Sequence, residues 1–151
     1  MARGLFDILD LFTHLFYEHL ELNSILRGVC RDGFRRQCVG FAIELLHEEI
    51  KAITDQPVKL VINENGQGHA MLGNSYWAEQ GVPIVAHTEA AEEIETYGGS
   101  ILEGMKRYNR DRAEGTFVQG PTETFEDEYI VDMGDFHIEA RHLGPAHSPG
   151  D

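Results

Sequence analysis

The stretch 61-VINENGQGHAMLGNSYWAEQGVPIVAH-87 decides the fold of this chain. Its first letters complete a short β-branched run over residues 58–62, which predicts a buried strand. A polar, Gly-rich loop with one histidine, His69, follows, and then come a short helix over residues 74–80 and a second buried strand over residues 83–86. This alternation predicts a layered α/β or α+β domain. The loop raises the question of a metal site.

Helical patterns flank this stretch on both sides. Apolar residues at three-and-four spacing predict a helix over residues 41–53, which Pro57 ends by forcing the preceding residue out of the helical region. After the second strand we expect Thr88 to cap a helix, because acidic residues follow in its first turn. Gly98 and Gly99 interrupt the pattern, so a separate helix is expected to begin near Ser100.

Alternation replaces the helical pattern from Phe125 onward. Two alternating sets of apolar residues on either side of a turn at Gly134 and Asp135 predict a β-hairpin: Phe125, Tyr129, Val131 and Met133, and then Phe136, Ile138 and Ala140. An amphipathic helix over residues 5–22 and a Gly- and Arg-rich loop or weak hairpin over residues 28–40 precede this α/β region.

Length and charge restrict the class of protein. A chain of 151 residues is expected to form a single domain, with residues 1–40 as an atypical N-terminal helix and loop. The net charge of −14, with no Lys/Arg stripe, excludes nucleic acid as a partner. No apolar run reaches the ~20 residues that span a bilayer, so we expect a cytoplasmic protein with no membrane partner.

Three segments resemble the metallo-β-lactamase superfamily of αββα metallohydrolases. HEEIKAITDQPVKLVIN is similar to the helix and strand that lead into the family's metal loop, and LGNSYWAEQGVPIVAHTEAAEEI to the helix and strand after it. TFEDEYIVDMGDFHIEARHLGPAHSPGD is similar to the paired strands that end in the third ligand loop. The likeness covers residues 45–151, and implies the family's N-terminal half within a domain region of residues 41–151.

The metal motif of that family is degenerate in this chain. The family carries H-x-H-x-D-H, and an ungapped alignment puts Asn65 and Gln67 at the first two histidines. His69 falls at the Asp position and Ala70 at the last His. The next family ligand, the His of an H-S/T-x-G-D turn, is matched by His147 in AHSPGD.

The resemblance implies a zinc-dependent hydrolase with an impaired site. Catalytic zinc takes three protein ligands and one water, and an amide oxygen is a weak substitute for imidazole. His147 and His69 would form a two-ligand remnant, completed by Glu64 or a water, with weak zinc binding or none. If active, the chain would hydrolyse its substrate with metal-bound hydroxide.

The alternative is a non-catalytic oligomerising or small-molecule-binding module that keeps only the scaffold. The family's second half is missing after Asp151, so we expect one sheet face to be covered by another chain or by the N-terminal helix, and self-association is predicted. In the loop, Asn65 and Gln67 offer amide hydrogen bonds, and Gly66 and Gly68 permit left-handed backbone, which suits a polar small molecule.

Three further histidines are set aside as ligands. His87 follows a buried strand, at a position that the resemblance makes structural. His137 and His142 lie five apart along a strand, so they face opposite sides and do not form a joint site.

Overall fold

The computed structural model describes residues 39–134 and 137–151. The helix expected over residues 5–22 and most of the loop expected over residues 28–40 lie outside this described part. The elements, in chain order, are α3 (Val39–Ile53), β1 (Val61–Asn63), α4 (Gly68–Met71), α5 (Asn74–Glu79), β2 (Ile84–His87), α6 (Thr88–Asn109), the 3-10 helix η1 (Arg110–Ala113), β3 (Glu123–Phe125), β4 (Glu128–Asp132) and β5 (His137–Arg141).

A parallel three-stranded sheet is the centre of the fold. Its strand order is β1-β2-β3, with Val61 opposite Ile84 and Val85 opposite Glu123. All four residues of β2 are buried, as expected for the middle strand of a parallel sheet that is covered by helices. The predicted α/β class is therefore confirmed.

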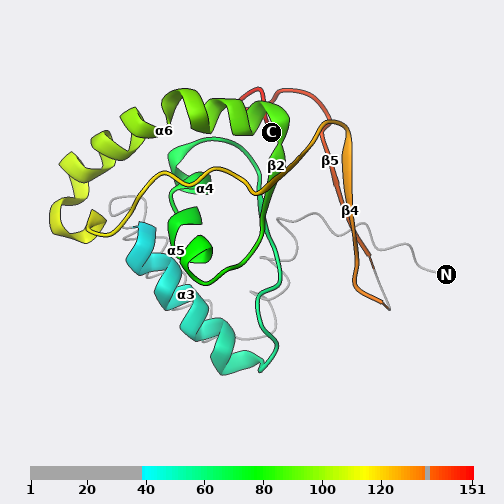
Figure 1. The fold of residues 1–151 in the computed structure, drawn as a ribbon, viewed down its shortest axis with the longest axis horizontal. Helices are drawn as coiled ribbons and strands as arrows, with labels where there is room; N and C mark the ends of the chain where they lie inside the picture. The colour runs from blue at the N-terminus through cyan, green and yellow to red at the C-terminus, as the bar shows by residue number, and fades with distance from the viewer. Residues whose placement is uncertain (1–38, 135–136) are drawn as a thin grey trace.

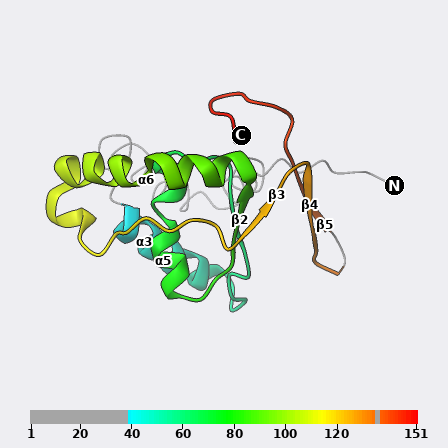
Figure 2. The same ribbon diagram turned by 45° about the horizontal axis from the view of Figure 1, so that its top comes forward.

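The helices gather on one side of β2, and the β4–β5 hairpin lies on the other side (Figures 1 and 2). Parallel neighbours need crossover connections, and here α4 with α5 joins β1 to β2, while α6 with η1 joins β2 to β3. The core beneath α6 consists of Met71, Leu72, Ile94 and Leu102. None of the helices within the described ranges combines the length and the apolar character needed to cross a membrane.

One long helix replaces the two that the glycines predicted. Helix α6 runs unbroken through Gly98 and Gly99, so the expected interruption is wrong. A Cβ on Gly98 would lie 2.7 Å from Val118 Cγ1, whereas one on Gly99 would meet nothing within 4 Å. Gly98 therefore allows the chain after η1 to pack close to the helix, and that packing outweighs the low helix propensity of glycine.

The hairpin is confirmed with a later start. Strands β4 and β5 pair antiparallel, with Tyr129 opposite Ala140. Phe125, which the alternation assigned to the hairpin, instead ends β3 and lies opposite His87 in the parallel sheet. Alternation of apolar residues shows that a segment is extended, but not which sheet it joins.

Candidate metal centre

Polar side chains collect at the carboxyl edge of the parallel sheet. Strand β1 ends at Asn63, β2 at His87 and β3 at Phe125, each followed by a turn or a helix start. Open α/β sheets bind their ligands outside the carboxyl ends of the strands, where the backbone turns away and leaves side chains accessible. This edge is therefore the place in the described structure to look for a site.

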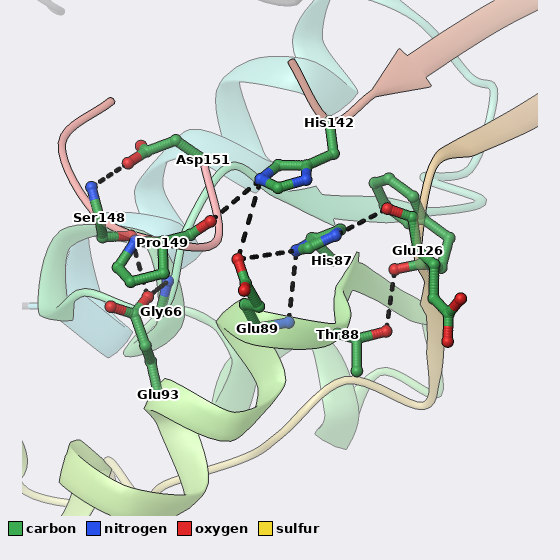
Figure 3. A network of polar contacts seen from close by, with 11 residues as sticks. Gly66, His87, Thr88, Glu89, Glu93, Glu126, His142, Ser148, Pro149 and Asp151 are labelled. Carbon is green, nitrogen blue, oxygen red and sulfur yellow. Dashed lines mark hydrogen bonds and ion pairs between the residues drawn. The ribbon is translucent and has the colours of Figure 1, made fainter. Parts of the chain in front are cut away.

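Three ligand-type side chains converge there: His87, Glu89 and His142 (Figure 3). One potential ligand atom from each lies within 4.8 Å of the other two. Glu89 Oε2 lies 4.0 Å from His87 Nδ1 and 3.9 Å from His142 Nε2. Among the residues that the structure describes, this is the group of three His, Cys, Asp or Glu side chains whose geometry suits a metal ion.

His87 is held in place by the sheet and the helix that it joins. It is the last residue of β2 and also the N-cap of α6, where its backbone is still extended (φ −62°, ψ 148°). Its Nε2 donates a hydrogen bond to the Glu126 carbonyl at 2.7 Å, which leaves the lone pair on Nδ1. That lone pair accepts only a long hydrogen bond, 3.3 Å, from the Glu89 backbone N–H. A metal-binding imidazole is commonly oriented in this way, by a carbonyl on its other nitrogen.

His142 reaches the same point from the opposite side. It directly follows β5, and its backbone N–H donates to the Asp127 carbonyl at 3.0 Å, which fixes the start of the last segment. Its ring stacks on that of His87 with centroids 3.7 Å apart and planes 25° apart. Its Nε2 is 3.0 Å from the Pro149 carbonyl oxygen. The two histidines thus form a rigid pair.

Glu89 supplies the negative charge of the cluster, and its exposed side chain is free to rotate. It lies in the first turn of α6, where its side chain is about half exposed (49%). Ligand atoms about 2.1 Å from a tetrahedral zinc lie about 3.4 Å apart. Closing the observed 3.9–4.0 Å separations therefore takes a small rotation of this exposed side chain. The carboxylate also offsets the positive end of the α6 dipole, which by itself disfavours a cation.

The two histidines predicted as ligands lie apart from this cluster. His69 Nε2 pairs with Glu64 Oε1 at 3.0 Å in an exposed contact, so the predicted partner Glu64 is beside it. His147 is exposed in the turn before Ser148. Neither belongs to the converging group.

The degenerate motif positions serve the structure of the loop. Asn65 is 2% exposed, its amide donates to Asp151 Oδ1 at 3.1 Å, and its Oδ1 accepts from the Gln67 backbone N–H at 3.0 Å. Gln67 is the N-cap of the short helix α4, and Ala70 is half-buried within that helix. Asn65 therefore uses its amide to brace the loop from within.

The two predicted ligand loops nevertheless meet, through Asp151. Burial raises the pKa of its carboxyl, but hydrogen bonds from the backbone of Ser148 and from the Asn65 amide outweigh burial and hold the pKa below its usual value. Ser148 also donates through Oγ to Glu93 Oε2 at 2.9 Å, and the Gly66 N–H donates to the same oxygen at 3.3 Å. These contacts fasten the segment after His147 to the loop after β1.

The glycines of that loop allow close packing, and they do not use the left-handed backbone that glycine permits. Positive φ values occur at other glycines of the described chain, such as Gly81 and Gly144. A Cβ on Gly66 would lie 2.5 Å from Glu93 Cβ, and one on Gly68 would lie 2.8 Å from Ile101 Cγ2. The loop therefore lies directly against α6.

Sequence reasoning set aside the two histidines that converge. His137 and His142 do not form a joint site: His137 contacts exposed Glu139, whereas His142 lies with His87 and Glu89. A signal that could have identified His87 was its place at the carboxyl end of an apolar strand, with Glu89 two residues later. His142 carried no such signal, since its contact with His87 spans more than fifty residues of chain.

Comparison with known proteins adds no family: no protein-family model matches the chain, and no curated protein matches its sequence significantly.

Proposed function

We propose that this chain binds one divalent transition-metal ion, of the zinc class, through His87, Glu89 and His142. The observation that carries the proposal is the convergence of these three side chains, with His87 Nδ1 left as the lone-pair nitrogen. Two imidazoles and one carboxylate are a ligand set of catalytic zinc sites, which keep a further position open. The exposed side of Glu89 gives solvent access to that position.

The resemblance to the metallo-β-lactamase superfamily supplies the reaction class, hydrolysis of an ester or lactam. A bound ion of this type lowers the pKa of water and polarises a carbonyl oxygen. In this chain the role of the residues is to hold and orient: the Glu126 carbonyl fixes the tautomer of His87, and stacking fixes the His142 ring. The proposed ligands differ from the positions that the family motif would use.

Zinc titration against a chromogenic chelator tests the binding and distinguishes the two candidate sites. We expect about one zinc per chain, and a loss of affinity of about 100-fold in His142→Ala, which removes a direct ligand. His147→Ala is the matched control, because it removes the histidine that the family motif favours and leaves the converging group intact. Glu89→Gln and Glu92→Gln form a second pair on the same helix.

The outcomes separate clearly. Weak binding in His142→Ala and Glu89→Gln alone, with folding intact by circular dichroism, supports the proposal. No stoichiometric zinc in the parent protein, or equal loss in His147→Ala, contradicts it. Zinc-dependent turnover of a chromogenic ester or lactam that disappears in His142→Ala supports the hydrolase class.

Self-association is a second candidate function, favoured by the hairpin surface. Ile130 is 55% exposed and Leu143 91% exposed, and Met133 is exposed as well. Within the described residues β4 and β5 pair only with each other, and an isolated two-stranded hairpin is marginally stable in water. Sedimentation equilibrium of the parent and of Ile130→Glu tests this, and a monomeric parent contradicts it.

A further inference from the structure

The turn formed by residues 147–151, hereafter the Pro149 turn, lies against the proposed metal site (Figure 3). Its Pro149 carbonyl oxygen is 3.0 Å from His142 Nε2, the same atom that faces Glu89. The site therefore has four potential ligand atoms, of which the fourth comes from the backbone.

The distances suit a shared ion. Two ligand atoms about 2.1 Å from one ion lie about 3.0 Å apart when they subtend a right angle, and about 3.4 Å apart at the tetrahedral angle. The separation of the Pro149 oxygen from His142 Nε2 falls at the lower end of this range without any movement. The contact with a carbonyl oxygen requires a proton on His142 Nε2, so this ring would hold an ion at Nε2 only in its other neutral tautomer, with the proton on Nδ1.

The position of the Pro149 turn depends on its packing against the first turn of α6. A Cβ on Gly150 would lie 2.6 Å from both Cα and Cβ of Ala90, which is fully buried. A Cβ on Gly66 would lie 2.7 Å from the Ala90 carbonyl oxygen. Ala90 is thus enclosed by the turn and by the loop after β1, next to the proposed ligand Glu89.

We propose, resting on the metal site above, that the Pro149 carbonyl is a fourth protein ligand, with the solvent-facing position beside Glu89 left open as the fifth, so that metal binding and docking of the Pro149 turn reinforce each other. Coupling of this kind is reciprocal: the ion holds the turn, and a docked turn raises the affinity for the ion by the same factor. Gly150 and Ser148 then act as positioning residues, which set the Pro149 oxygen without touching the metal. Asp151 and Glu93 receive the hydrogen bonds that keep the turn closed.

Hydrogen exchange with zinc as the probe tests the coupling. In the parent protein we expect zinc to slow exchange of the backbone amides at 148, 150 and 151 and in the loop 65–67. Gly150→Ala, which lifts the turn from Ala90, should weaken zinc binding about 10-fold, as loss of a supporting contact does in metal sites. Gly99→Ala is the matched control, because a Cβ there meets nothing within 4 Å.

A milder variant covers the case in which Gly150→Ala does not fold. Ser148→Ala removes only the hydrogen bond from Oγ to Glu93, and Ser100→Ala, whose hydroxyl bonds within its own helix, is its control. Weaker zinc binding in Ser148→Ala but not in Ser100→Ala supports the coupling. Tight zinc binding with unchanged or faster exchange in the Pro149 turn overturns this inference and leaves the metal site standing, whereas no zinc binding at all overturns both.

Discussion

Two regions at the same sheet edge have opposite characters. In the loop after β1, polar groups are paired at ordinary hydrogen-bond distances, such as Asn65 with Asp151 at 3.1 Å. At the end of β2, Glu89 lies 3.9–4.0 Å from two imidazole nitrogens, too far for a hydrogen bond and near enough to share an ion. The loop that resembles a metal motif holds the Pro149 turn through hydrogen bonds, and the groups suited to bind a metal ion lie at the end of the neighbouring strand.

The contrast shows that whether a side chain can bind a ligand depends more on whether its polar atoms already have close hydrogen-bond partners than on its residue type. Asn63 and Asn74 exchange amide hydrogen bonds at 3.0 and 2.8 Å, which close the base of the loop. His87 Nδ1, by comparison, has only a 3.3 Å contact. A buried polar group that is already paired gains little from a metal.

The largest effect expected from this comparison is the stabilisation of the folded protein by zinc. A ligand that binds only the folded state adds about 4 kcal/mol at 1,000 times its Kd. We expect an increment of this size in the parent protein and in His69→Ala, and none in His87→Ala, when urea unfolding is compared in zinc and in chelator. An increment that persists without His87, or vanishes without His69, would reverse the roles of the two regions.

The next largest effect is expected in the loop, from Asn74→Ala. This change removes the donor to Asn63 Oδ1 and to the Gln119 carbonyl, and buried unsatisfied groups cost about 1–3 kcal/mol each. We predict a loss of about 3 kcal/mol in the free energy of unfolding, measured by urea titration, with the zinc increment retained. Glu79→Ala, exposed on the same helix, should change little, and an equally small effect of Asn74→Ala would show that the amide pair does not brace the loop.

Sequence patterns predicted the helices and strands better than the contacts between them. The apolar runs located β1 and β2 to within about three residues, because burial on both sides of a parallel strand leaves a strong local signal. The continuity of α6 was not predictable, since it depends on Val118 packing against Gly98. Local propensity yields to such contacts, which the sequence does not reveal.

The same limit explains why the sequence did not predict the residues of the proposed site. Asn65, Gln67 and His69 attracted attention because they occupy a known motif in one continuous segment. The contact of His142 with His87 depends on where the β4–β5 hairpin lies relative to the parallel sheet. No periodicity along the chain encodes that placement, although the sequence does show that polar residues follow the apolar part of β2.

A direct way to sharpen the comparison is to rebuild the motif with Asn65→His. The resemblance alone predicts a gain in zinc affinity, because a family histidine is restored. We expect instead a loss of about 1–3 kcal/mol in unfolding free energy and no gain in zinc affinity, since the larger ring must replace a buried amide bonded to Asp151. Gln67→His, at a half-buried position, is the milder control, and tighter zinc binding in Asn65→His would restore the motif hypothesis.

The smallest effect is expected where the loop most resembles the proposed metal centre, in the pair of Glu64 with His69. Each region places a carboxylate near an imidazole, but the Glu64 and His69 side chains are 56% and 42% exposed, and water screens their attraction. Exposed pairs of this kind contribute about 0–1 kcal/mol, so Glu64→Gln should alter stability by less than about 0.5 kcal/mol and leave zinc affinity unchanged. Glu89→Gln should leave stability in chelator nearly unchanged but remove most of the zinc increment. Glu64 has one histidine partner, whereas Glu89 has two. If the two substitutions change the zinc increment alike, the second imidazole facing Glu89 does not distinguish the regions. If they differ, the second imidazole is the reason.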